Sequence, residues 1–106
     1  MIDFNFDTSE NTLNFHFKGR LDTENSRNIS NEIEEHIGDY IISDNEKPLK
    51  IVFDIKEVDY VASAFIRICI KAAREVDQDN FALRNSSPMI KKIFKIAGLA
   101  EVLNVS

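Results

Sequence analysis

The clearest structural pattern in the chain lies in residues 51–66, IVFDIKEVDYVASAFI. Ile51-Val52-Phe53 is a run of β-branched and aromatic side chains without alternation, which predicts the central strand of a sheet, covered on both faces. Asp54 is the predicted end of that strand, and a polar connection then leads through a second apolar pair, Tyr60-Val61, to a helix. The helix is predicted from about Ala64 to Val76, because its polar side chains recur at helical spacing.

Two segments nearer the N-terminus alternate apolar and polar residues, the pattern of half-buried strands. The apolar positions are Ile2, Phe4 and Phe6 in the first segment and Leu13, Phe15 and Phe17 in the second. Residues 7–11 between them have the composition of a turn, so the two segments predict a hairpin. An amphipathic helix is predicted from about Glu24 to Ile42, followed by a break at residues 43–48.

The C-terminal part predicts a short strand at Phe81-Ala82-Leu83, then a helix, then a last short strand from Val102 to Val105. Ser87-Pro88 supplies a capping hydroxyl and a proline for the start of that helix, and Gly98 is suited to its end. The predicted order is ββαβαβαβ. It indicates an α/β fold in a single domain, residues 1–106, with a mixed β-sheet (N-terminal hairpin plus parallel strands) packed with about three main α-helices.

The charge is unevenly distributed along the 106 residues, which carry 18 acidic and 13 basic side chains and a net charge of −5. Residues 1–60 hold 14 acidic and 6 basic side chains, whereas residues 61–106 hold 4 and 7. The acidic balance disfavours binding to a phosphate backbone, so a protein partner is expected and nucleic acid is not. The basic stripes, Arg67/Lys71/Arg74 and Lys91/Lys92/Lys95, are interpreted as solvated helix faces, with partner contacts as the alternative.

The chain offers few features of a membrane, secreted or metal-binding protein. No 18 apolar residues run together and the start lacks a basic, apolar leader, so we expect a cytoplasmic protein without membrane insertion. The single cysteine, Cys69, excludes an internal disulfide, and no Cys/His spacing offers a zinc site. Cys69 is expected in the core, and the isolated His16 and His36 are expected at the surface.

Catalytic and nucleotide-binding motifs are missing, because the only glycines, Gly19, Gly38 and Gly98, form neither a P-loop nor a dinucleotide fingerprint. No cofactor and no enzymatic activity are predicted. At the end of its strand Asp54 is open to three interpretations: a solvent-facing or turn-capping carboxylate, which is preferred, a phospho-accepting aspartate, or part of an anion site with the helix near Ala64.

Ser63, directly before the predicted helix, also has two interpretations. As an N-cap, its hydroxyl would accept a backbone N–H of the first turn, worth about 1 kcal/mol relative to alanine. As a modified residue, it would carry a phosphate of about −1.5 to −2 charges at the positive end of the helix.

Three parts of the chain carry a family resemblance: residues 17–23 (FKGRLDT), residues 51–54 (IVFD) with 58–63 (VDYVAS), and residues 93–99 (IFKIAGL) with 102–103 (VL). They resemble the STAS domain family, the fold of bacterial anti-sigma-factor antagonists, and the likeness runs from about Leu13 to the C-terminus. In order, they resemble the family's second strand and its exit, its central strand with the loop to the regulatory serine, and its closing helix and terminal strand.

The resemblance implies a non-enzymatic regulator that binds an anti-sigma factor, itself a serine kinase of the histidine-kinase-like ATPase type. Carried over by position, it makes Ser63 the phospho-acceptor, and phosphorylation would prevent binding. The partner surface would comprise the loop after Leu21, the loop before Ser63 and the start of the following helix. Its predicted residues are Asp22, Thr23, Asp59, Tyr60, Ala62, Ser63, Ala64, Phe65 and Arg67.

Two alternatives remain. Ala62 and Phe65 replace an acidic residue and a glycine that are common in the family, which favours a STAS-fold interaction module or assembly subunit without a phospho-switch. A small nucleotide- or anion-binding domain using Asp54 is the other. The partner's identity, the pathway and the oligomeric state do not follow from the sequence.

Overall fold

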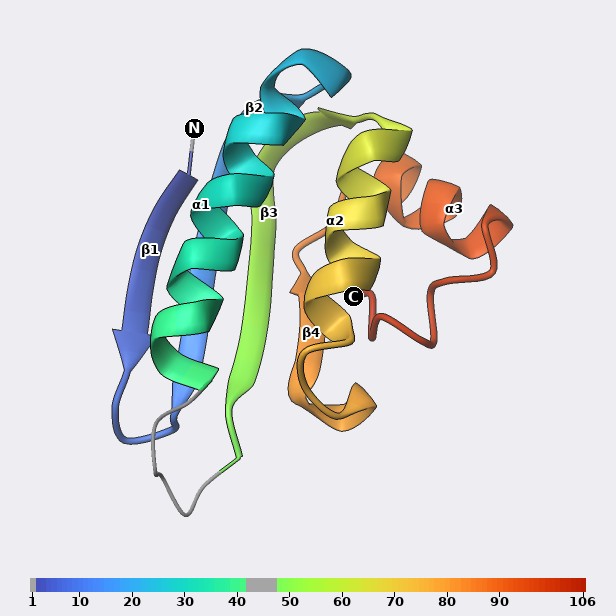
Figure 1. The fold of residues 1–106 in the computed structure, drawn as a ribbon. Coiled ribbons are helices and arrows are strands. Elements are labelled where there is room, and N and C mark those ends of the chain that lie inside the picture. Colours follow the sequence, from blue (N-terminus) through green and yellow to red (C-terminus); the bar gives the residue numbers. More distant parts are fainter. Residues whose placement is uncertain (1, 42–47) are drawn as a thin grey trace.

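The computed structural model describes residues 2–41 and 48–106. Its elements are β1 (Ile2–Asp7), β2 (Thr12–Leu21), α1 (Thr23–Ile41), β3 (Lys50–Val61), α2 (Ser63–Ala73), the 3-10 turn η1 (Gln78–Asn80), β4 (Phe81–Arg84) and α3 (Pro88–Ile96) (Figure 1). The predicted break at residues 43–48 and the predicted end of the first helix at Ile42 fall outside the described residues, apart from Pro48.

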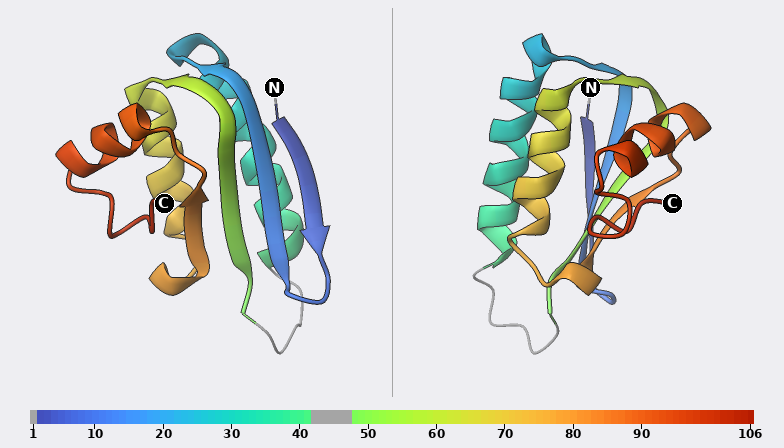
Figure 2. Two further views of the ribbon diagram at one scale, coloured as in Figure 1. Left: turned by 180° about the vertical axis from the view of Figure 1, so that it is seen from behind. Right: turned by 90° about the vertical axis from the view of Figure 1, so that its right-hand side faces the viewer.

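The four strands form one sheet in the order β1-β2-β3-β4. β1 and β2 pair antiparallel, and β2–β3 and β3–β4 pair parallel, so the predicted mixed sheet with an N-terminal hairpin is confirmed. α1 and α2 lie side by side on one face of the sheet, with α3 on the other side near the β4 edge (Figure 2). Both α1 and α2 begin at the edge where β2 and β3 end (Figure 1).

The predicted end of the central strand at Asp54 is wrong, because β3 continues without interruption to Val61. Its buried positions change period: Ile51, Phe53 and Ile55 alternate, and Val58 and Val61 follow in steps of three. Each step of three coincides with a register shift against β2, where β3 has one residue more than its partner strand. The polar connection predicted from the sequence is therefore a bulged part of the strand.

Gly19 pairs with Val58, and the second register shift lies between this pair and the next one, Arg20–Tyr60. Its φ of +84° is a conformation that side chains with a Cβ rarely adopt. The glycine thus lets β2 follow the irregular β3 up to Leu21, which pairs with Val61 at the end of both strands.

The predicted last strand, Val102 to Val105, is also corrected. Residues 101–104 form turns, and only Val105 bridges to the sheet, beside Leu83. Asn104 has a φ of +49°, which bends the chain too sharply for a ladder to extend. The segment is nevertheless anchored, since the Ser106 N–H donates to the Leu83 carbonyl at 2.9 Å.

The core between the sheet and the helices is rich in phenylalanine. The fully buried rings are Phe15, Phe17, Phe53, Phe65, Phe81 and Phe94. Phe17 meets Phe53 edge-on with centroids 5.0 Å apart, and Phe53 meets Phe81 in the same way at 5.1 Å. Such pairs each add about 0.5–1.5 kcal/mol beyond area burial, so this cluster helps to hold β2, β3 and β4 together.

Two local predictions are confirmed. The Ser87 Oγ accepts the Ile90 N–H at 3.2 Å and caps α3, with Pro88 at the first position of the helix. Cys69 lies buried in α2, where burial raises the pKa of its thiol well above the usual range. Within the described residues, no helix has both the length and the apolar character needed to cross a membrane.

Candidate partner-binding and phosphorylation site

Ser63 is placed at the edge of the sheet by the last rung between β2 and β3. Leu21 and Val61 are paired there, and the next residue, Ala62, donates its N–H to the Leu21 carbonyl at 2.8 Å. This bond ties the residue before α2 to the end of β2, so residues far apart in the sequence meet at one edge. The start of α1 lies beside it (Figure 1).

The prediction that Ser63 is an N-cap is wrong. The cap position is Ala62, which is extended at φ −91° and ψ 165° and offers no side-chain hydrogen bond. Its carbonyl accepts the Phe65 N–H at 3.0 Å, so Ser63 is already the first helical residue. The reason is the Ala62–Leu21 hydrogen bond, which fixes Ala62 in an extended conformation and makes the helix begin one residue earlier than predicted.

The Ser63 side chain is exposed, and its hydroxyl has no hydrogen-bond partner within residues 2–41 and 48–106. Ser87, at the start of α3, shows what a capping serine does in this fold, because its Oγ binds a backbone N–H. The structure gives Ser63 no such role. A structural explanation for a serine at this position is therefore missing.

Asp22, between β2 and α1, and Thr23, the first residue of α1, are the first two predicted partner residues. Asp22 is half-buried, and its carboxylate accepts the Asn25 N–H at 3.0 Å, which caps the start of α1. Its carbonyl accepts the Ser26 hydroxyl at 2.5 Å. Thr23 is exposed beside them. Asp22 thus has a structural task in addition to any contact with a partner.

Asp59 and Tyr60 lie on the last bulged part of β3 and are exposed, Tyr60 to 41%. The Arg20 guanidinium lies over the Tyr60 ring, with its carbon 4.2 Å from the ring centroid. Ala64 is half-buried and Arg67 is exposed on the first turns of α2. Asp59, Tyr60 and Arg67 are therefore exposed charged or aromatic residues within four positions of Ser63 along the chain.

Two predicted partner residues are not on the surface. Phe65 is completely buried, and its ring meets Phe17 edge-on with centroids 5.2 Å apart. Ala62 is only 7% exposed. As the third residue of α2, Phe65 points toward the sheet, and Ala62 is enclosed by the strand-to-helix turn. The prediction that these two side chains face a partner is corrected accordingly.

A cleft of about 400 Å³ between the first turns of α1 and α2 was not predicted. Its lining includes Thr23, Ser26, Arg27, Ala64, Arg67 and Lys71. Arg67 was on the predicted surface, but Arg27 was missed because a sequence does not reveal which helix faces are neighbours. The only signal is spacing: Arg27 follows the exposed Thr23 by four residues, which places both on one face of a helix.

A second polar cluster lies on the sheet face that α1 and α2 leave uncovered. His16 contacts Glu57 at 2.6 Å and Asp54 at 3.4 Å, although it was predicted as an isolated surface residue. The hydrogen bond to Glu57 is the main reason that the pKa of His16 is raised, and the Asp54 charge adds to it. The same bond lowers the pKa of Glu57. His36 is half-buried and stacks on Phe4 with centroids 3.9 Å apart.

Asp54 is not part of an anion site with α2. It lies in the middle of β3, and Val61 is seven positions further along the chain, roughly 23 Å along a regular strand. Its Oδ1 accepts the Lys56 N–H at 3.0 Å and the Asn85 side-chain amide at 3.1 Å. Partial burial would raise the pKa of Asp54, but these donors and His16 together lower it. Among the described residues, no three histidine, cysteine or carboxylate side chains are placed to hold a metal ion.

Comparison with known proteins gives a consistent family match. A family model described as STAS domain matches residues 3–106. A search of curated protein sequences found no significant match.

Solved structures of anti-sigma-factor antagonists share the fold. A STAS domain protein from Planctomyces limnophilus matches with a TM-score of 0.79 and 18% identity over 99% of this chain and 87% of that one. An antagonist from Mycobacterium paratuberculosis gives 0.76 and 14% over 99% and 85%. The Bacillus protein SpoIIAA in its phosphorylated form gives 0.67 and 17% over 100% and 91%.

Proposed function

The chain belongs to the STAS domain family, and we propose that it is an anti-sigma-factor antagonist whose binding to a partner kinase is controlled by phosphorylation of Ser63. The observation that carries the proposal is the exposed Ser63 hydroxyl, which caps nothing and binds nothing among the described residues. Structures of SpoIIAA in unphosphorylated and phosphorylated forms support it by likeness of fold.

The proposed partner is an anti-sigma factor or switch kinase of the histidine-kinase-like ATPase type, in the cytoplasm of a bacterium. In the phosphorylation step the Ser63 oxygen bonds to the γ-phosphorus of ATP, the bond from that phosphorus to the ADP oxygen breaks, and the hydroxyl proton is released. The kinase supplies this chemistry. The antagonist itself contributes an accessible acceptor and is not an enzyme.

Phosphorylation would act on affinity through charge. It adds about −1.5 to −2 charges at the centre of the proposed partner surface, where Ser63 follows the exposed Asp59 by four residues and the next residue, Ala64, lines a cleft together with Thr23. A dianion in an interface must be desolvated and repels acidic groups of the partner. The Ser63 side chain is exposed, so the modification has no packed side chain to displace.

The test is phosphorylation by histidine-kinase-like ATPases of the host, co-expressed one at a time and followed by intact-mass measurement. We expect one ATPase to add one phosphate to the wild-type chain and to Ser87→Ala, but not to Ser63→Ala. Calorimetry with that ATPase should then show at least a tenfold weaker complex for the phosphorylated chain, about 1.4 kcal/mol. Equal phosphorylation of Ser63→Ala and wild type would reject Ser63 as the acceptor.

The second candidate function is an interaction module without a switch. It is favoured by Ala62, which leaves no carboxylate directly before Ser63. A stable complex with the ATPase whose affinity is the same for wild type and Ser63→Asp, without phosphate transfer, would support the module over the antagonist.

A further inference from the structure

Two arginines without an acidic partner line the cleft between α1 and α2. Arg27 on α1 and Arg67 on α2 are exposed, and neither forms an ion pair within residues 2–41 and 48–106. Lys71, further along the same cleft, is paired with Glu34. The chain has a net charge of −5, yet this cleft holds two guanidinium groups without a neutralising partner among the described residues. Their positive charge favours the binding of an anion in the cleft.

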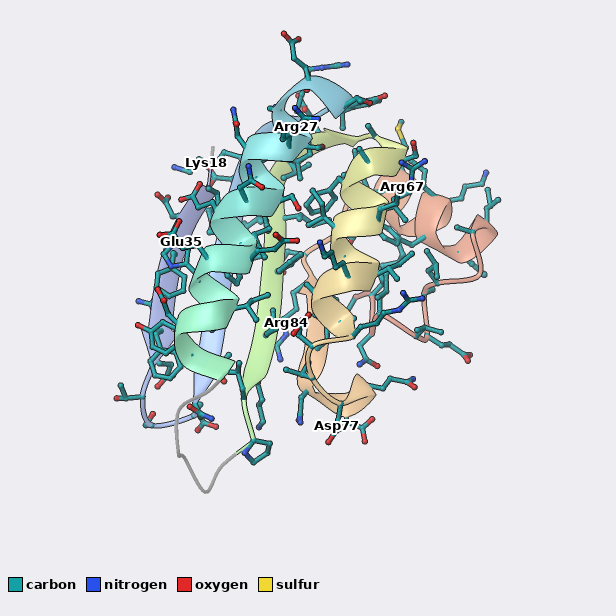
Figure 3. All side chains as sticks on the ribbon, in the orientation of Figure 1. Lys18, Arg27, Glu35, Arg67, Asp77 and Arg84 are labelled. Carbon is teal, nitrogen blue, oxygen red and sulfur yellow. The ribbon has the colours of Figure 1, made fainter. Side chains whose placement is uncertain are left out.

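Ser63 is one helical turn from Arg67. Residues four apart on a helix are neighbours, with their Cβ atoms about 5–6 Å apart, and helical side chains lean toward the N-terminus. The Arg67 side chain therefore leans toward the turn that holds Ser63, and Ala64 lines the same cleft. Figure 3 shows Arg27 and Arg67 near the adjacent upper ends of α1 and α2.

The relative direction of the helices brings the second arginine to the same place. α1 and α2 run side by side in the same direction, so their first turns are adjacent (Figure 1). Arg27 and Ala64 line one cleft, which puts Arg27 across the groove from the beginning of α2. Ser63 does not itself line the cleft, but it stands directly before Ala64 and one helical turn before Arg67, which do. A phosphate on its hydroxyl lengthens the side chain and can thus reach the guanidinium groups of the two helices.

We propose that this cleft is a phosphate-binding site and that its occupant is the phosphate carried by Ser63 of the same chain. The inference rests on the proposed function, because it requires that Ser63 is phosphorylated. Guanidinium groups bind phosphate oxygens through paired, charge-assisted hydrogen bonds. Arg67 holds the phosphate from its own helix, and Arg27 holds it from α1.

The clamp, formed by Arg27 and Arg67 around the phosphate, has two physical consequences. It favours the dianionic phosphate, because two neighbouring cations stabilise the more negative form and lower the second pKa of the phosphate. It also links α1 to α2, so phosphorylation stabilises the fold instead of straining it. The partner then meets a phosphate that is held in one place and partly covered by the chain's own arginines.

The experiment uses the full chain with phosphoserine incorporated genetically at position 63, so no kinase is needed. Phosphorus NMR follows the titration of this phosphate in the wild-type background and in Arg67→Gln, Arg27→Gln and Arg74→Gln. Arg74 is the matched control. It is an exposed arginine directly after the last residue of α2, and it does not line the cleft. Both cleft arginines are exposed, and unfolding of the unmodified variants checks that they fold.

We expect the phosphate in the wild-type background to titrate about one pH unit below free phosphoserine. Arg67→Gln should remove most of this shift, Arg27→Gln part of it, and Arg74→Gln little. A titration midpoint that is the same in the wild-type and Arg67→Gln backgrounds would overturn the clamp. The proposed function fails separately, if no host ATPase phosphorylates Ser63 or if the phosphate leaves partner affinity unchanged.

Discussion

Removal of the Ser63 hydroxyl should leave the stability of the protein almost unchanged, whereas removal of the Ser87 hydroxyl should lower it. The two serines stand near the start of α2 and α3, and their hydroxyls are equally solvated in the unfolded chain. In the folded chain, Ser87 accepts the Ile90 N–H at 3.2 Å, but Ser63 is the first residue of its helix and makes no such bond. The comparison therefore isolates the structural role of each hydroxyl.

The magnitudes follow from the two positions. Replacing a capping serine by alanine costs about 0.5–2 kcal/mol, so Ser87→Ala should lower the free energy of unfolding by about 1 kcal/mol. Ser63→Ala should change it by less than about 0.5 kcal/mol, in the stabilising direction if at all, because alanine has the higher helix propensity. With a urea m-value of about 1–3 kcal/mol/M, Ser87→Ala should shift the unfolding midpoint by roughly 0.3–1 M.

Urea unfolding of the two variants and their double mutant, followed by far-UV circular dichroism, measures these differences. Within the described residues the two hydroxyls share no hydrogen-bond partner, so the effects of the two substitutions should add. If Ser63→Ala lowers stability as much as Ser87→Ala with an unchanged m-value, the Ser63 hydroxyl is structural. The argument that it is free for modification would then be wrong.

Three further predictions concern the scaffold. The pKa of His16 is raised in the folded chain, so its contribution to stability is complete below the ordinary value of about 6.5 and is lost as pH rises through the folded value. The stability advantage of wild type over His16→Gln should therefore shrink above about pH 6.5 in urea titrations, and a constant difference would refute it. Phe65→Ala should lower the free energy of unfolding by about 3–5 kcal/mol, because it removes a buried ring. Tyr60→Ala removes an exposed ring and its contact with Arg20, and should lower it by about 1 kcal/mol. Equal losses of stability in thermal unfolding would contradict the assigned burial. Gly38→Ala within α1 should stabilise the folded chain by about 0.5–1 kcal/mol, whereas Gly19→Ala, at φ +84°, should destabilise it by about 1–2 kcal/mol. An added Cβ meets no atom within 4 Å at either site, so the difference comes from the backbone conformation alone. Changes of the same sign in the free energy of unfolding would refute this argument.

The fold was predictable where the sequence pattern and the local conformation have the same period. Alternation in residues 2–6 and 13–17 predicted the hairpin, and Ser87 with Pro88 predicted the start of α3. The prediction failed in β3, where the spacing of buried residues changes from two to three at the bulges. A bulge depends on the register with the neighbouring strand. Register is a property of two paired segments, so it cannot be read from the sequence of either segment alone.

The same limit applies to the site. Ser63 was predicted as important from its place between a strand and a helix, but its role as a cap was wrong because one cross-strand bond, Ala62 to Leu21, decides where the helix begins. Phe65 was placed on the surface by analogy of position, yet an aromatic ring at the third residue of a helix on a sheet points into the core. The contact of His16 with Glu57 joins residues 41 apart in the sequence and likewise requires the register.

The surroundings of Ser63 determine how a modification there can act. The residue before it is held by the Leu21 carbonyl, and the Phe65 ring two residues later is fixed between Phe17 and Phe53. A phosphate at Ser63 therefore adds charge to a rigid base, because any movement of the backbone would break the strand-to-helix hydrogen bond or expose the buried ring. It follows that the proposed phosphorylated form would differ from the unphosphorylated one mainly in electrostatics at one edge of the sheet, and that, under the proposed clamp, the arginines of the neighbouring cleft would determine how much of the new charge a partner meets.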